Sequence, residues 1–315
     1  MADRRNAGAA LREGLARGVL SFPLTAFDES GGLDLDGYRQ HVRAQVDAGP
    51  GALFACCGTG EFFSLDEDEY AALIAVATEE ARGRCPVVAG VGYGWPLAVR
   101  FASAAQDAGA DAGLLMPPYL IEAPQAGIVR HVEEVAARTG LPLIVYQRAQ
   151  VKLSVEAVRG LAAVDTVVGI KDGHGDLDQV LRLKLAAPED WLFFNGVATA
   201  EMQAQAYSSI GVPAYSSAVH AFAPEIAQAF FRALHGGDEV SARRLLSGFY
   251  LPLVELRDRG QGYAVSLVKA AARLRGARVG PVRAPLTDPG AEHTARLTEI
   301  LRAGLELVGV TDDLR

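Results

Sequence analysis

The 315-residue chain contains little lysine and little cysteine, and it has no long run of apolar residues. Cys56, Cys57 and Cys85 are odd in number and lack zinc-type spacing, so neither a disulfide framework nor a metal site is expected. A reducing cytoplasm fits this cysteine content. No apolar stretch reaches the roughly 18 residues that indicate a membrane span. Residues 1–17 lack the apolar segment of a signal peptide.

An excess of basic residues is also absent. The chain has 30 Lys and Arg against 38 Asp and Glu, which gives a net charge of −8. No basic run interleaves with aromatic residues, which argues against nucleic acid as a partner. An acidic surface offers no long-range attraction to an anionic substrate, so any such attraction must be local.

Short apolar runs alternate with longer amphipathic stretches over the first 235 residues. Continuous rather than alternating hydrophobicity predicts strands that are buried on both faces, as in a parallel sheet. The predicted strands are Gly18–Pro23, Gly51–Ala55, Pro86–Gly90, Ala112–Met116, Leu143–Tyr146, Val167–Lys171, Trp191–Asn195 and Gly211–Ser216. The predicted helices are Ala9–Ala16 and residues 35–48, 67–82, 95–108, 125–139, 154–163, 176–186 and 199–209.

Eight such strands fit either a closed (β/α)₈ barrel or an open doubly wound sheet. The first βα loop lacks a dinucleotide-type glycine fingerprint, so the closed TIM barrel is favoured. From Pro224 onward the pattern is helical only, with helices predicted at residues 224–235, 238–256, 263–274 and 290–306. We therefore expect a barrel over residues 1–235 and a C-terminal helical extension over residues 236–315.

One of only four lysines, Lys171, ends an apolar run that is typical of a buried strand. In a (β/α)₈ barrel the reacting groups lie at the carboxyl ends of the strands. Desolvation there would lower the pKa of the amine, and a neutral amine can form a Schiff base with a ketone. The alternative is a strand-end lysine whose ammonium group reaches water.

Tyr146 ends the strand that precedes the one carrying Lys171. Neighbouring parallel strands lie about 4.8 Å apart, so the phenol and the amine can meet over one substrate. Schiff-base chemistry needs such a proton carrier. A tyrosine at the edge of the core is the alternative interpretation.

Two further groups are candidates for binding a carboxylate. The loop Gly58-Thr59-Gly60 offers closely spaced N–H groups and a hydroxyl, although it can equally be a plain tight turn. Arg148, two residues after Tyr146, can clamp a carboxylate with two parallel bonds, or it can simply face solvent.

Together these positions resemble the dihydrodipicolinate synthase / N-acetylneuraminate lyase superfamily, from about Gly18 to Leu307. Its members are (β/α)₈ barrels with a C-terminal helical extension, a glycine-threonine loop after strand two, a tyrosine after strand five and a Schiff-base lysine on strand six. Several stretches are similar to a dehydratase branch of this family. They are residues 20–25 (LSFPLT), 58–65 (GTGEFFSL), 171–173 (KDG), 215–219 (YSSAV) and 262–269 (GYAVSLVK).

The resemblance implies that Lys171 is the Schiff-base lysine and that Tyr146 and Thr59 assist it in catalysis. It implies substrate contacts from the strand ends and loops, namely Gly58, Gly60, Arg148, Gly196, Ser216 and Ser217. Several residues depart from the expected pattern, among them Cys57, Gln147 and Asn195. These departures leave the Schiff base intact and bear on the identity of the substrate.

The implied reaction converts 5-dehydro-4-deoxy-D-glucarate to 2,5-dioxopentanoate, water and carbon dioxide, with no metal or organic cofactor. The implied setting is carbohydrate-acid metabolism in the cytoplasm, in a homotetramer or homodimer. One alternative is another Schiff-base aldolase or hydro-lyase acting on a 2-keto-3-deoxy sugar acid. A second is a catalytically silent homologue that binds a sugar acid.

Overall fold

The computed structural model describes residues 2–312 and 314, with side chains from residue 9 onward. Eight parallel strands close into a barrel in sequence order, and β1 pairs with both β2 and β8. The strands are β1 (Leu20–Ser21), β2 (Ala52–Ala55), β3 (Val87–Val91), β4 (Ala112–Leu115), β5 (Leu143–Gln147), β6 (Val167–Asp172), β7 (Leu192–Asn195) and β8 (Ala214–Ser217). The predicted closed barrel is confirmed, and the open sheet is excluded.

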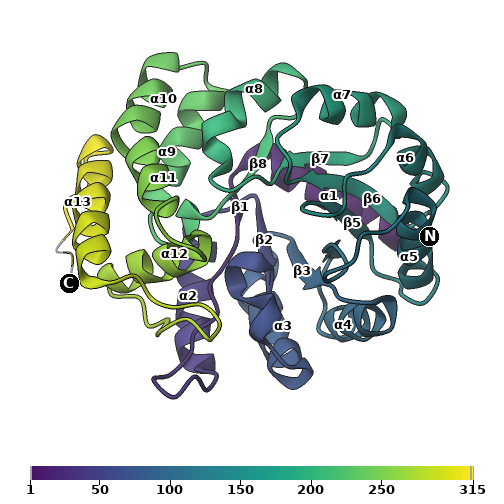
Figure 1. The fold of residues 1–315 in the computed structure, drawn as a ribbon, viewed down its shortest axis with the longest axis horizontal. Coiled ribbons are helices and arrows are strands. Elements are labelled where there is room, and N and C mark those ends of the chain that lie inside the picture. Colours follow the sequence, from purple (N-terminus) through teal and green to yellow (C-terminus); the bar gives the residue numbers. More distant parts are fainter. Residues whose placement is uncertain (1, 313, 315) are drawn as a thin grey trace.

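A ring of helices surrounds the barrel (Figure 1). It consists of α2 (Leu35–Asp47), α3 (Glu67–Ala81), α4 (Trp95–Asp107), α5 (Gln125–Ala136), α6 (Val155–Leu161), α7 (Leu177–Ala186), α8 (Ala204–Ser209) and α9 (Pro224–His235). Local sequence explains where helices begin. Asp66 and Glu69, for example, form a reciprocal capping box at the start of α3.

Side chains alternate between the two faces of the barrel wall, because successive strand residues point to opposite sides. Leu20, Phe54, Ile144 and Phe194 belong to the cluster that fills the barrel interior. Helix α1 (Ala2–Arg17) adds Leu11 and Leu15 to this cluster, so it closes the amino-terminal end of the barrel. Helix α1 is longer than predicted, since it continues through Gly8 instead of starting after it.

The remaining helices gather on one side of the barrel, at the left of Figure 1. They are α10 (Glu239–Leu245), α11 (Leu251–Arg257), α12 (Tyr263–Leu274) and α13 (Ala291–Leu307). The single helix predicted at residues 238–256 is interrupted by a π-helical turn, η5 (Leu246–Tyr250), directly before Pro252 enters α11. That residues 236–315 form a unit separate from the barrel stays a prediction. Within the described residues, no helix combines the length and apolar character needed to cross a membrane.

Candidate active site

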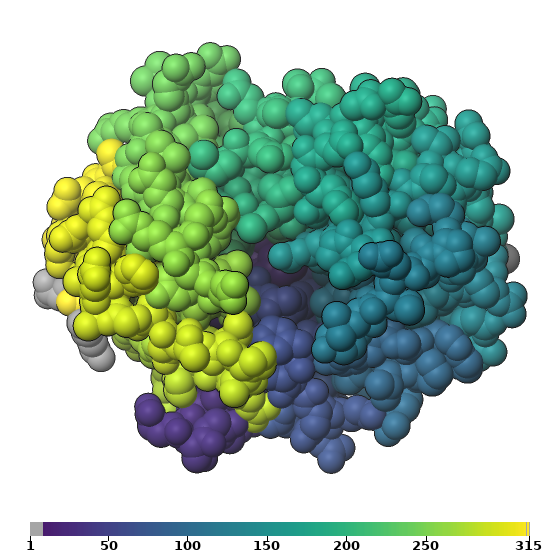
Figure 2. All heavy atoms as spheres, viewed as in Figure 1, coloured from purple at the N-terminus to yellow at the C-terminus, as the bar shows by residue number. Residues whose placement is uncertain are grey.

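A pocket of about 580 Å³ lies at the carboxyl ends of the strands. One wall comes from the βα loops, and the opposite wall comes from α12. Figure 2 shows the molecule hollowed near the middle of one face, between the green and yellow C-terminal helices and the blue and teal loops. In a TIM barrel the active site lies at the carboxyl ends of the strands, so this pocket is the candidate site.

Backbone strain is concentrated around the same rim. Residues other than glycine that adopt positive φ cost about 1–3 kcal/mol each, and such strain clusters at functional sites. In the described part of the chain, all such residues follow the carboxyl ends of strands: Cys56, Glu61, Tyr93, Leu120, Ala149 and Thr199.

Lys171 and Tyr146 are direct register partners on β6 and β5. Both side chains point inward, and the Lys171 Nζ atom lies 4.5 Å from the centroid of the Tyr146 ring. Phe22 lies on another side of the amine, 4.3 Å from Nζ to the ring centroid. The structure therefore brings together the amine and the phenol that the sequence analysis singled out.

The surroundings of Lys171 favour the neutral amine. The residue is only 6% exposed, and burial lowers the pKa of its amine to about 7. The nearby Arg148 guanidinium lowers this pKa as well, whereas Cys57 acts in the opposite direction. Near neutral pH, a large fraction of the protein thus carries an uncharged nucleophile.

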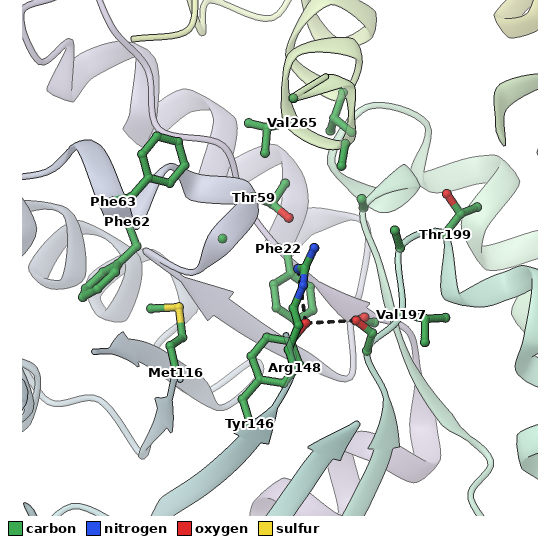
Figure 3. Close-up of a pocket in the computed structure, with 18 of the residues that line it drawn as sticks. Phe22, Thr59, Phe62, Phe63, Met116, Tyr146, Arg148, Val197, Thr199 and Val265 are labelled. Carbon is green, nitrogen blue, oxygen red and sulfur yellow. Dashed lines mark hydrogen bonds between the residues drawn. The ribbon is translucent and has the colours of Figure 1, made fainter. Parts of the chain in front are cut away.

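Tyr146 is positioned by its neighbours on both sides. Its hydroxyl donates to the Gly196 carbonyl at 3.1 Å, and Arg148 Nη1 donates to the same hydroxyl at 3.4 Å. Figure 3 shows Tyr146, Arg148 and Phe22 close together, with Thr59 nearby. Burial raises the pKa of Tyr146, and Arg148 partly offsets this effect. The phenol is therefore protonated in the resting site, where its hydroxyl both donates and accepts a hydrogen bond.

Gly196 also makes room for the lysine. A Cβ atom at this position would lie 2.2 Å from Lys171 Cε, so only glycine fits here without displacing the amine. At the end of β7, Gly196 therefore lets the backbone approach Lys171 closely, and it also provides the carbonyl that accepts from Tyr146.

The predicted carboxylate loop is a 3₁₀ turn, η1 (Gly58–Gly60), of which Gly58 and Thr59 line the pocket. Because these two residues open the turn, their N–H groups have no acceptor within it. Gly60 does not fit the prediction of a substrate contact: it is buried, its N–H donates to the Cys57 carbonyl, and its own carbonyl accepts from Thr25.

The sequence analysis missed a residue that fixes this loop. Lys269 of α12 is fully buried and donates to Glu61 Oε1 at 2.7 Å, directly after the turn. Glu61 Oε2 accepts from the Arg283 N–H at 3.0 Å. A lysine flanked by apolar residues within a helix, Val268 and Ala270, is the signal that could have indicated its burial.

The two serines at the end of β8 face opposite sides. Ser216 lines the pocket, and its hydroxyl donates to the Asn195 carbonyl at 3.2 Å. Ser217 is fully buried outside the pocket, where its hydroxyl donates to Glu201 and accepts from the His220 N–H. Ser217 does not line the pocket as the predicted substrate contact would require, because consecutive strand residues alternate between faces.

Three departures from the expected pattern lie away from the pocket surface. Cys57 packs in the barrel-interior cluster, and burial raises the pKa of its thiol to about 12. Gln147 points outward and donates to Asp172, while Asn195 bonds Ala200 and Val197 within its own loop. His174, which is half-buried, bonds the Val151 carbonyl outside the pocket. Within the described residues, no cluster of three or more His, Cys, Asp or Glu side chains is suited to a metal ion.

A barrel enzyme that forms a Schiff base needs an amine that is neutral near physiological pH, with a proton carrier beside it. This pocket provides both, and the protein is a lyase of that Schiff-base-forming class. A match over residues 15–304 gives the narrower grouping: the chain belongs to the Dihydrodipicolinate synthetase family.

Relatives with assigned names agree with one another. The chain is 65% identical to "Probable 5-dehydro-4-deoxyglucarate dehydratase 2" of Streptomyces coelicolor, over 95% of this chain and 93% of the relative. It is 42% identical to "5-dehydro-4-deoxyglucarate dehydratase" of Pseudomonas putida, over 88% of this chain and 92% of the relative.

Solved structures show the same fold. Dihydrodipicolinate synthase from Bacillus clausii is 26% identical and superposes with a TM-score of 0.85, over 92% of this chain and 98% of the other. The enzyme from Oceanobacillus iheyensis is 25% identical, with a TM-score of 0.86 over 94% of this chain and 98% of the other.

Proposed function

We propose that the protein dehydrates and decarboxylates 5-dehydro-4-deoxy-D-glucarate to 2,5-dioxopentanoate, through a Schiff base on Lys171. The observation that carries this proposal is the buried amine of Lys171 beside the Tyr146 phenol at the barrel mouth. The names of the relatives, which agree from 42% to 65% identity, support the substrate.

The reaction follows from the electron demand of the iminium. The Lys171 amine attacks the ketone, and loss of water gives an iminium that acidifies the adjacent methylene. Loss of a proton from this methylene gives an enamine, which expels the β-hydroxyl as water. The conjugated iminium then accepts the electron pair left by the far carboxylate as carbon dioxide departs. Protonation at carbon and hydrolysis release the aldehyde product and restore the amine.

Tyr146 is the proton carrier in this scheme, because its hydroxyl lies beside the amine and is held by Arg148 and Gly196. The Thr59 hydroxyl and the N–H groups of Gly58 and Thr59 bind the carboxylate next to the ketone. Arg148 forms no ion pair within the described residues, so its guanidinium is available to a substrate carboxylate. Ser216 meets the polar groups further along the substrate.

The substrate is a small keto-sugar diacid, and we propose no role for nucleic acid, a membrane, a metal or an organic cofactor. We further propose a cytoplasmic homotetramer or homodimer, as the family resemblance implies. Sedimentation velocity of the purified chain distinguishes these assemblies from a monomer.

Borohydride reduction in the presence of the diacid, followed by peptide mass spectrometry, tests the chemistry. We expect a reduced adduct on Lys171, together with carbon dioxide and an aldehyde in the unreduced reaction. Lys171→Ala should abolish both, whereas Lys184→Ala, on α7 outside the pocket, should change neither.

Other outcomes lead to the alternative functions. Release of pyruvate from 2-keto-3-deoxy sugar acids would identify an aldolase. Binding of the diacid without any trapped adduct would identify a silent binding protein, and either result would overturn the proposal.

A further inference from the structure

Glu201 is a buried carboxyl group in the wall of the pocket that the scheme above does not use. It lies on the 3₁₀ turn η3 (Ala200–Gln203), directly after the rim residues Val197, Ala198 and Thr199, and it is 1% exposed. Its Oε1 atom accepts from the Ser217 hydroxyl. Its Oε2 atom has no hydrogen-bond partner among the described residues.

Two more buried oxygens without a partner within the described chain belong to the same cluster: the hydroxyls of Tyr215 on β8 and Tyr250 on η5. The elements packed against η3 include β8 and η5, besides α8, which follows η3 in the chain. In addition to burial, Glu201 and Tyr215 both raise the pKa of the Tyr250 phenol. Buried polar groups in proteins are normally hydrogen-bonded to protein or to ordered water. An ordered water needs two to four polar partners, a number that these three oxygens can supply.

The carboxyl group of Glu201 holds its proton to a higher pH than an exposed glutamate does. Burial raises its pKa to about 7, and the Ser217 hydroxyl only partly opposes this. The titratable groups that face it are the phenols of Tyr215 and Tyr250, and burial raises the pKa of both. The nearby cation Arg257 of α11 bonds Thr199, and its charge is paired with Asp258. Near pH 7, a substantial fraction of the protein therefore carries Glu201 as a neutral acid.

The reaction proposed above needs an acid of this kind. The substrate carries two negative charges and the product carries one, while carbon dioxide and water leave uncharged, so each turnover consumes one proton. The proton that Tyr146 removes from the methylene leaves with the hydroxyl as water. Decarboxylation gives an enol, whose O–H proton accounts for one of the two C–H bonds that form afterwards. The proton for the other C–H bond must come from elsewhere.

We propose that Glu201 supplies this proton, through water held by the unpaired oxygens of Glu201, Tyr215 and Tyr250. The O–H bond of the carboxyl group breaks, the proton passes along the water to the electron-rich dienamine left by decarboxylation, and a new C–H bond forms. Solvent then reprotonates the carboxylate. Glu201 acts through water and does not touch the substrate, so it is a proton-relay residue. This inference rests on the proposed decarboxylating function.

Glu201→Gln is the direct test, because the amide keeps the size of the side chain and can still accept from Ser217. We expect kcat to fall by roughly 10²-fold, within the usual range for a lost proton donor, with KM nearly unchanged. The alkaline limb of the kcat–pH profile, which the wild type should show near pH 7, should disappear. Trapping of the adduct on Lys171 should continue at the wild-type rate.

Three further measurements keep the test independent of folding. Glu201→Asp retains the acid and should restore part of kcat and the alkaline limb. Infrared difference spectra between the wild type and Glu201→Gln should show a protonated carboxyl band that titrates near pH 7. Tyr250→Phe removes one water ligand and should lower kcat without moving the acid limb of kcat/KM.

Wild-type kcat and an unchanged alkaline limb in Glu201→Gln, with adduct still forming on Lys171, would overturn the relay and leave the proposed function standing. An infrared spectrum that shows an ionised Glu201 well below pH 7 would overturn it as well. Absence of any adduct in the wild-type protein would instead refute the proposed function itself.

Discussion

At the scale of single residues, Lys171 is subject to opposing influences. The faces of Phe22 and Tyr146 attract an ammonium group, by about 0.5–2 kcal/mol in comparable contacts. Burial opposes the charge, and the pKa near 7 shows that burial dominates. The amine is thus close to balance between a charged form held by aromatic rings and a neutral form able to attack.

The rate of Schiff-base formation should follow this balance. Below pH 7 the amine is increasingly protonated, so kcat/KM should fall about tenfold per pH unit on the acid side and level off above it. Stopped-flow trapping with borohydride isolates this step from proton delivery. A midpoint near the ordinary value of 10.5 would contradict the prediction, because it would mean that the amine is fully solvated.

Gly196→Ala should remove activity while leaving the barrel folded. The added Cβ would lie 2.2 Å from Lys171 Cε and 3.0 Å from the Asp172 carbonyl oxygen, so the lysine must leave its position. We expect kcat to fall by at least roughly 10²-fold, the typical cost of a misplaced reacting group. The adduct yield and the far-ultraviolet circular dichroism spectrum check the two parts of the prediction.

Gly94→Ala is the matched control. Gly94 lies after β3 on the same rim, yet the nearest atom to a Cβ there is 3.8 Å away. It should retain wild-type turnover, and equal losses in both variants would contradict the steric explanation.

Some site residues follow from local sequence and others do not. Lys171 and Tyr146 could be predicted because each ends an apolar run, and ends of adjacent strands meet at one barrel mouth. Ser217 could not be separated from Ser216 without the register that sets which face each occupies. Glu201 was missed because nothing in its local pattern shows that its Oε2 atom is left without a partner.

At the scale of elements, the strands were the most predictable part, since burial on both faces gives continuous apolar runs. The long-range links between elements were not predictable. Glu61 and Lys269 are 208 residues apart, yet their pair joins the carboxylate loop to α12. The π-helical turn η5 was missed because no residue type marks it, and it carries Tyr250 toward Glu201.

Lys269→Met should destabilise the protein strongly and weaken substrate binding. It leaves the Glu61 carboxylate buried without its cation, which typically costs about 3–5 kcal/mol. KM should rise because the loop that carries Gly58 and Thr59 is no longer fastened to α12. Urea unfolding and steady-state kinetics measure the two effects.

Two variants serve as controls for this ion pair. Combining Lys269→Met with Glu61→Gln should recover much of the stability, because no unpaired charge remains. Arg278→Met breaks an ion pair with Asp34 in which the arginine is exposed, and it should cost no more than about 1 kcal/mol. Similar losses in Lys269→Met and Arg278→Met would contradict a special role for the buried pair.

At the scale of the whole molecule, α1 closes the barrel at its amino-terminal end, and the C-terminal helices form a wall on one side (Figure 1). The architecture followed from the order of the predicted elements. Which extension helix reaches the pocket did not follow, because it depends on packing between segments that are distant in sequence. A buried histidine network also ties β1, α2 and η4 (Val219–Ala221) together.

The two buried histidines His41, on α2, and His220, on η4, should make the fold sensitive to acid. Burial lowers the pKa of His41 to about 3 and that of His220 to about 4, from an ordinary value of 6.5. Between the lowered pKa values and 6.5, the unfolded chain binds more protons than the folded one. The contribution of these histidines to stability is therefore complete above pH 6.5 and is lost as the pH falls toward 4. The slope is about 1.4 kcal/mol per pH unit for each proton.

Urea unfolding across this range, with His41→Gln beside the wild type, measures the contribution. The variant should show a shallower loss, because His41 Nε2 accepts from the Leu24 N–H only while the ring is neutral. His235→Gln, at an exposed position, should leave the slope as it is. An unchanged slope in His41→Gln would contradict the assignment.

Helix α12 has a practical consequence for engineering. Ala264, Val265 and Val268 line the pocket from a segment that is not part of the barrel strands. Randomising these three positions would reshape one side of the cavity while leaving the residues that do the chemistry in place. New sugar-acid preferences could therefore be selected by changing a single helical surface.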